Sequence, residues 1–262
     1  MAMSATPRLF VESDLAEGGM SWLVEEQAHY LTRVLRLGVG APVRLFNGRD
    51  GEFDAELASS TKNAAELRVG SRVREQARPP DLWLLFAPLK KTRTDFVVEK
   101  AVELGVREIR PVLTERCEAQ AVRTDRLQRI AIEAAEQTER LDVPPVQEAQ
   151  RLDLALKGWD PARLLYFCDE AGDEGNRPWG GDAGRAPPLA DVLKSSPSPS
   201  GAVLIGPEGG FSPAERAMLR KLDFVRPVGL GPRILRAETA AAAALTIWQA
   251  VLGDWASSRD TH

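Results

Sequence analysis

Two glycine-rich loops, each lying between a short apolar run and a helix signal, constrain the fold of this chain more than any other feature. Residues 202–205 are apolar and precede the first loop, which consists of Gly206, Pro207, Glu208, Gly209 and Gly210. Residues 225–228 precede the second loop, residues 229–236, which leads into an alanine-rich helix. Because one helix separates the two units, we expect adjacent parallel strands with both loops at one carboxyl edge, where open α/β sheets bind ligands.

The first loop leads directly into a strong helix start. Ser212 is a suitable N-cap, Pro213 fits the first helical position, and Glu215 completes a capping box. This unit therefore reads as strand, glycine loop and helix, an arrangement in which glycine permits close backbone approach to a ligand.

The chain divides at residues 76–80, which contain Pro79 and Pro80 and lack periodicity. Before this point, short strands surround a turn at Asn47 and Gly48, with one helix over residues 27–37. After it, a buried strand at 82–87 is followed by helices over 92–104 and 125–141, the first opening with a capping box of Thr92 and Asp95. We therefore predict a small β-rich domain over residues 1–75 and an α/β domain with a parallel sheet over 81–262.

Charge and residue inventory exclude several classes of protein. The formal net charge is −4, so an RNA hypothesis has to rest on a local site and not on a generally basic surface. Cys117, Cys168, His29 and His262 are too few and too dispersed for a zinc or iron–sulfur site. The longest apolar stretch, residues 240–252, is too short to span a bilayer. We expect no metal, no membrane span, reduced thiols and a cytoplasmic location.

Glu208 bears on the kind of ligand that the first loop could bind. A phosphate-binding loop would carry a lysine and a Ser/Thr pair after its last glycine, whereas a carboxylate would repel phosphate. A ligand with positive charge and no phosphate, such as S-adenosylmethionine, fits better. A tight turn that only reverses the chain is an equal alternative from this loop alone. If the loop binds a ligand, valine at Gly209 should abolish binding, because it would resist positive φ and block the backbone.

Several motifs, in order and spacing, resemble the RsmE-type ribosomal RNA small subunit (16S) uridine-N3 methyltransferases of the SPOUT superfamily. The N-terminal part carries HYL at 29–31, VLR at 34–36 and FNG at 46–48, and the central part carries EKAVELGV at 99–106, Pro111 and TER at 114–116. The C-terminal part carries GPEGG at 206–210 and LGPRILRAETA at 230–240. The resemblance covers nearly the whole chain.

The resemblance implies a PUA-like RNA-binding barrel followed by a SPOUT domain with a trefoil knot, a homodimer, and S-adenosylmethionine bound in the knot. Residues 172–188 look longer than this family carries. The expected cofactor-binding residues are Ile205, Gly206, Pro207, Glu208, Gly209, Gly210, Leu230, Gly231, Ile234 and Leu235.

Methylation of N3 requires an unpaired base, loss of the N3 proton and stabilisation of negative charge on the uracil carbonyls. Arg236, at the end of the second loop, is the first candidate for that stabilisation, with a cap or an ion pair to Glu238 as the alternative. Arg116, just after a strand, is a second candidate, or forms a plain salt bridge. Gln137 and Arg140 share a helix face that could be solvated, and the resemblance favours a site role for them. No general base can be named.

In the N-terminal domain, Arg8, Arg33 and Arg36 are the candidates for contacts with phosphates of 16S ribosomal RNA, which we expect the protein to bind within the small ribosomal subunit. Scattered, solvated arginines are the alternative, and the motif favours Arg36. His29 is expected to be structural.

Three other functions compete with this interpretation. An enzyme of the same superfamily with another RNA target lacks support from the two-domain signature and the first loop. An RNA-binding ribosome-assembly factor would not need intact cofactor loops. A nucleotide-dependent oxidoreductase would carry a Gly-x-Gly-x-x-Gly fingerprint with a following acidic residue, which this sequence lacks.

Overall fold

The computed structural model describes residues 6–61, 63–117, 121–169, 186–196 and 198–255. The chain forms two compact units, the first made of residues 1–78 and 132–143 and the second of residues 79–131 and 144–262. Residues 132–143, which we expected in the C-terminal domain, thus cluster with unit 1. Most of the expected insertion at 172–188 lies outside the described residues.

Unit 1 contains a five-stranded sheet with the order β1-β3-β4-β5-β2. The strands are β1 (Arg8–Phe10), β2 (Met20–Val24), β3 (Pro42–Phe46), β4 (Glu52–Ser60) and β5 (Ala64–Arg74). Strand β1 is parallel to β3 and the other pairs are antiparallel. Alternating side chains of β4 and β5 enter a core that includes Leu57 and Leu67. The β-rich prediction is therefore confirmed. The expected helix at 27–37 is shorter and consists of α1 (Glu25–His29) and a π-helical turn, η1 (Tyr30–Val34).

Arg8 connects this sheet to the end of helix α3 (Thr124–Gln137) within unit 1. Its guanidinium donates to the carbonyl oxygens of Ala135, Glu136 and Arg140 at 2.9–3.0 Å, and its Nε pairs with Glu52. The last carbonyls of a helix lack partners in the helix itself, so a cation is stabilising there. The Arg8 side chain is only 9% exposed. The expectation that Arg8 contacts phosphate is therefore corrected: its donors serve the fold.

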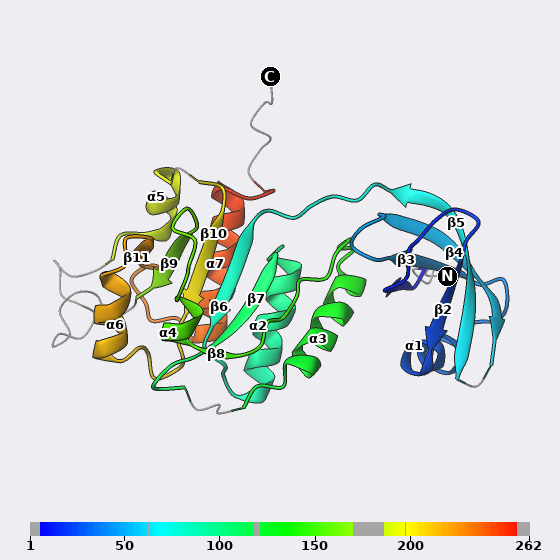
Figure 1. Cartoon of the computed structure of the whole chain (residues 1–262), viewed down its shortest axis with the longest axis horizontal. Helices are drawn as coiled ribbons and strands as arrows, with labels where there is room; N and C mark the ends of the chain where they lie inside the picture. The colour runs from blue at the N-terminus through cyan, green and yellow to red at the C-terminus, as the bar shows by residue number, and fades with distance from the viewer. Residues whose placement is uncertain (1–5, 62, 118–120, 170–185, 197, 256–262) are drawn as a thin grey trace, which may run out of the picture. The chain divides into compact units, whose positions relative to one another are not determined.

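Unit 2 contains a six-stranded parallel sheet with the order β11-β9-β10-β6-β7-β8 (Figure 1). The strands are β6 (Leu82–Phe86), β7 (Glu108–Leu113), β8 (Gln150–Arg151), β9 (Leu164–Cys168), β10 (Gly201–Ile205) and β11 (Val225–Val228). Strand β10 is buried throughout, as expected for a central parallel strand. One expectation was wrong: β10 and β11 are not adjacent, because β9 lies between them. Both glycine loops still lie at one edge, since all three strands are parallel.

Helices alternate with these strands. They are α2 (Lys91–Glu103), α3, α4 (Leu152–Ala155), α5 (Leu189–Lys194), α6 (Pro213–Arg220) and α7 (Ala237–Val251). Helix α7 packs on β10 and contacts α2 and α5, and its Trp248 is fully buried. The fold is therefore the expected α/β class. The trefoil knot stays a prediction.

Two predicted helix starts had different outcomes. The capping box of α6 is confirmed, because Ser212 Oγ accepts from the Glu215 amide and the Glu215 carboxylate accepts from the Ser212 amide. The predicted box of Thr92 and Asp95 was wrong. Helix α2 begins at Lys91 without a side-chain cap, and Asp95 pairs instead with Arg126.

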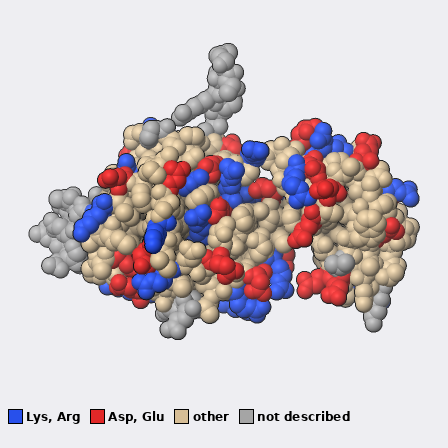
Figure 2. Space-filling view, in the orientation of Figure 1, with Lys and Arg blue, Asp and Glu red and all other residues tan. Residues whose placement is uncertain are grey.

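Basic and acidic side chains are interspersed over the face shown in Figure 2. This mixture agrees with the small net charge of −4. In the described part of the chain, no helix is both long and apolar enough to span a membrane.

Candidate cofactor pocket

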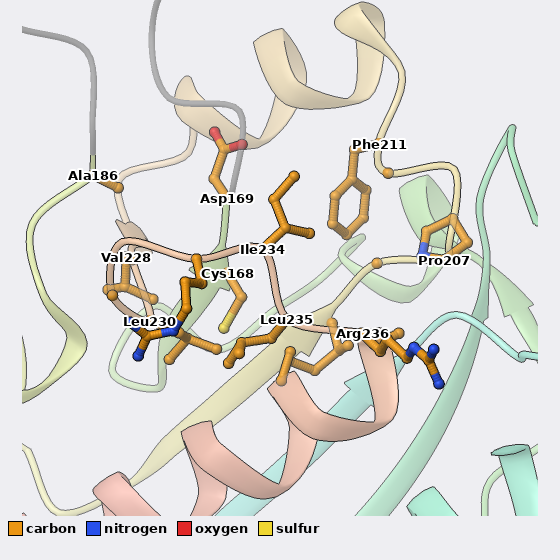
Figure 3. A pocket seen from close by; sticks show the side chains of 18 of the residues that line it. Cys168, Asp169, Ala186, Pro207, Phe211, Val228, Leu230, Ile234, Leu235 and Arg236 are labelled. Atoms are coloured by element: carbon orange, nitrogen blue, oxygen red, sulfur yellow. The ribbon is translucent and has the colours of Figure 1, made fainter. Parts of the chain in front are cut away.

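The carboxyl ends of β9, β10 and β11 meet at a pocket within unit 2 (Figure 3). Its volume is about 750 Å³, in the range of sites for small molecules. The two glycine loops form much of its wall. Every residue that we expected to bind cofactor lines it, together with Arg116 and Arg236: Ile205, Gly206, Pro207, Glu208, Gly209, Gly210, Leu230, Gly231, Ile234 and Leu235.

The start of the first loop is shaped by aromatic packing. A Cβ atom on Gly206 would lie 2.6 Å from the ring of Phe211. Phe211 is buried and meets the Phe167 ring edge-on, with ring centroids 4.9 Å apart. Glycine is therefore required at position 206 so that Phe211 can close this wall of the pocket, a reason that the sequence did not reveal.

The buried carboxylate of Glu215 links the first loop to the end of β7. Besides capping α6, it accepts a hydrogen bond from the Glu115 amide at 2.8 Å. The neighbouring Arg116 donates from Nη1 to the Gly209 carbonyl at 3.0 Å. Arg116 is exposed and makes no salt bridge with a described acidic residue, so the plain ion pair that we considered for it is absent there.

The backbone of the loops differs from one expectation. Among the glycines of the two loops, which all lie in the described part of the chain, positive φ occurs at Gly210 (66°) and Gly231 (105°), and not at Gly209. A Cβ atom on Gly209 would lie 3.4 Å from the Cβ of Arg116, an ordinary contact. The argument that valine at Gly209 would resist positive φ was therefore wrong, and that conformational demand belongs to Gly210 and Gly231.

The second loop is exposed from Gly231 to Ile234, and Ile234 has 57% of its surface exposed. Arg236 is the N-cap residue of α7 and is also exposed. Its guanidinium makes no hydrogen bond or ion pair with a described residue. The alternative of a pair with Glu238 is not formed, because Glu238 pairs with Arg93. The Arg236 guanidinium is thus available to a ligand at the pocket.

Sequence reasoning missed the contribution of β9. Cys168 and Asp169 line the pocket where this strand ends, and Arg216 lines it from α6. The buried Asp169 carboxylate pairs with Arg216 at 3.0 Å and with Arg220 at 2.6 Å. In Figure 3, Asp169 and Arg236 lie far apart across the pocket. The apolar run 164–168 was the available signal, since residues that follow parallel strands concentrate at such sites.

Burial raises the pKa of the Cys168 thiol to about 12, and the nearby Asp169 carboxylate acts in the same direction. The thiol therefore stays protonated at neutral pH. A protonated thiol is a poor nucleophile, so Cys168 contributes to the wall of the pocket and does not act as a covalent catalyst.

The remaining candidates lie in unit 1. Gln137 is exposed at the end of α3, whereas Arg140 is held by Asp142 through two hydrogen bonds of 2.8 and 2.9 Å. Neither lines the pocket, and their role in catalysis stays a prediction. Arg33 and Arg36 are exposed, as contacts with phosphate require, and Arg36 has a positive φ of 54°.

No group of three or more metal-ligating side chains occurs in the described part of the chain. Both cysteines are free.

Comparison with known proteins identifies one family in the N-terminal part of the chain and another in the C-terminal part. Residues 76–249 match an RNA methyltransferase domain family, and residues 23–70 match an RNA methyltransferase PUA domain family. The ribosomal RNA small subunit methyltransferase E of Rickettsia conorii is 33% identical over 91% of this chain and 93% of its own length. The protein of the same name from Synechocystis is 34% identical over 88% of this chain and 73% of its own length.

A solved structure extends the comparison to the cofactor. The ribosomal RNA small subunit methyltransferase E of Neisseria gonorrhoeae, bound to S-adenosylmethionine, is 29% identical, with a TM-score of 0.78. The alignment covers 95% of this chain and 99% of that protein.

Proposed function

The chain belongs to the ribosomal RNA small subunit methyltransferase E family, and on that premise we propose that it transfers a methyl group from S-adenosylmethionine to N3 of a uridine in 16S ribosomal RNA. The observation that carries the proposal is the convergence of both glycine loops on one pocket at the carboxyl edge of the parallel sheet.

The chemical character of the pocket supports S-adenosylmethionine as its ligand. The first loop carries the carboxylate of Glu208 and no basic residue, and apolar side chains such as Phe211, Leu230 and Leu235 line the pocket. These features suit a ligand without phosphate, and the two loops offer backbone groups for its polar atoms. The bound cofactor supplies an electrophilic methyl group on sulfur. All other parts of the reaction fall to the protein and the RNA.

The protein has to align the base and stabilise the charge that develops on it. As the N3 proton leaves, negative charge develops on N3 and the neighbouring carbonyl oxygens. That charge is neutralised when N3 bonds to the methyl carbon and the bond between the methyl group and sulfur breaks, with its electron pair going to sulfur. The unpaired Arg236 guanidinium is the group at the pocket best placed to donate to such an oxygen. Arg116 donates to the Gly209 carbonyl, so we assign it the role of holding the first loop in its conformation. Solvent is the simplest acceptor for the proton.

The wider proposals follow from the family. We propose that the protein is a homodimer, that its substrate is 16S ribosomal RNA within the small ribosomal subunit, and that it acts in the cytoplasm, where that substrate is located. The PUA-like unit, through Arg33 and Arg36, would contact RNA phosphates. Light scattering at micromolar concentration tests the dimer, since a single monomer mass would contradict it.

Mass spectrometry of nucleosides from 16S ribosomal RNA tests the function. Cells that lack the protein should lose N3-methyluridine, and the gene should restore it. Purified protein should also transfer labelled methyl groups to small subunits from those cells. Retention of the nucleoside in the deleted strain, without transfer in vitro, would rule out the proposed reaction.

A further inference from the structure

One arginine from a third element contacts both the first cofactor loop and the start of α7, the helix that directly follows the second loop. Arg93, on α2, places Nη1 3.2 Å from a carboxylate oxygen of Glu208 in the first loop. Its Nε lies 3.5 Å from a carboxylate oxygen of Glu238, the second residue of α7. Because the second loop leads directly into α7, Arg93 connects the first loop to the start of the helix that follows the second loop.

The burial of Glu238 makes its ion pair with Arg93 important for stability. Its side chain is only 16% exposed, and its Oε2 atom is buried without a hydrogen-bond partner. In the described part of the chain, Arg93 is the basic residue that forms an ion pair with Glu238. Loss of the guanidinium would leave a poorly solvated carboxylate without a counter-ion, which is more costly than loss of an exposed pair.

The link also depends on the shape of the arginine side chain. Nε and Nη1 of Arg93 address two different carboxylates, which a planar guanidinium with several fixed donors can do. A lysine carries one point charge at the end of a flexible chain, so it could neutralise one carboxylate but would hold both loops poorly. The two loops follow β10 and β11, which are separated in the sheet by β9.

We propose that Arg93 is a positioning residue that fixes the two cofactor loops relative to each other, so that the pocket loses affinity for S-adenosylmethionine when the link is cut. Glu208 then acts by holding Arg93, in addition to its electrostatic effect on a cationic ligand. The inference rests on the proposed function.

Calorimetric titration of the full-length protein with S-adenosylmethionine provides the first test. Arg93→Ala should raise the Kd for S-adenosylmethionine about tenfold. The Kd of Arg93→Lys should lie between those of Arg93→Ala and the wild type. Arg129→Ala is the matched control, because this arginine of α3 also makes a partly exposed ion pair, with Asp125, and does not line the pocket. It should bind as the wild type does.

A double variant separates positioning from simple stability. Arg93→Ala should lower Tm, and adding Glu238→Gln should restore much of it by removing the unpaired charge. Kd of the double variant should stay raised, because the link between the loops is still absent. Recovery of affinity together with Tm, or an unchanged Kd in Arg93→Ala, would overturn the proposal. If wild-type protein did not bind S-adenosylmethionine, the proposed function itself would fail.

Discussion

At the scale of single residues, the unpaired state of Arg236 allows a sharp test of catalysis. Arg236→Ala should slow methyl transfer by roughly 10²–10³, the usual effect of removing one donor to developing charge. Affinity for S-adenosylmethionine should change little, because the guanidinium meets a charge that appears on uracil only as N3 reacts. Single-turnover methylation with saturating small subunits, beside a cofactor titration, measures both quantities. A loss of affinity in proportion to rate would make Arg236 a cofactor residue instead.

The glycines of the two loops should differ in their tolerance of substitution. Gly231 has φ of 105° and no atom within 4 Å of an added Cβ, so a side chain meets conformational strain without a steric clash. Gly231→Val should weaken cofactor binding between about fivefold and about 150-fold, because strain of about 1–3 kcal/mol moves the loop. Gly209→Ala should bind nearly as the wild type does, since its Cβ would make an ordinary contact. Equal losses in both would show that φ is not the determining factor.

At the scale of elements, contacts between residues that are close in sequence could be predicted, and contacts between residues that are distant in sequence could not. The capping box of Ser212 and Glu215 involves neighbours in sequence, and the structure contains it. The box expected for Asp95 fails because this carboxylate pairs with Arg126, far along the chain. Arg8 shows the same limit, since its partners at the end of α3 are more than a hundred residues away. The loops of the site could be predicted from their glycines, but the strand β9 between them could not be placed by local pattern.

The end of α3 carries a group whose ionisation should weaken unit 1. Burial raises the pKa of Glu136 to about 7, outweighing a hydrogen bond from the Phe10 amide and the nearby Arg8, while Glu133 adds to the shift. Its ordinary value is 4.5. A raised folded pKa means that stability is complete below the unfolded value and is lost as pH rises through the folded one. The contribution should therefore decline between about pH 4.5 and 7 and be absent above that.

Glu136→Gln removes this ionisation and keeps an oxygen for the Phe10 amide. At pH 8.5 the variant should be more stable than the wild type by about 1–3 kcal/mol, and at pH 4 the two should be similar. Thermal unfolding across this range provides the measurement, with the exposed Glu12→Gln as control. A difference independent of pH would contradict the assignment of Glu136 as the titrating group.

At the scale of the whole molecule, the residues proposed to bind cofactor and those proposed to bind RNA belong to different units. All residues that line the pocket belong to unit 2, whereas the exposed Arg33 and Arg36 belong to unit 1. Affinity for RNA should therefore be separable from affinity for cofactor, because the net charge of −4 leaves RNA binding to local groups.

Combined replacement of Arg33 and Arg36 by alanine should weaken binding to small ribosomal subunits and leave the Kd for S-adenosylmethionine unchanged. Each phosphate contact on a single strand contributes roughly 0.7 to the slope of log K against log salt, so the slope should become shallower by about 1 to 1.4. The rate from the saturated complex should stay near that of the wild type, since these side chains act before the chemical step. Arg68→Ala, which removes an exposed arginine of unit 1 that pairs with Glu56, is the control. If the double variant and this control had the same salt slope, the two arginines would not contact phosphate, and RNA recognition would have to be sought elsewhere on the protein.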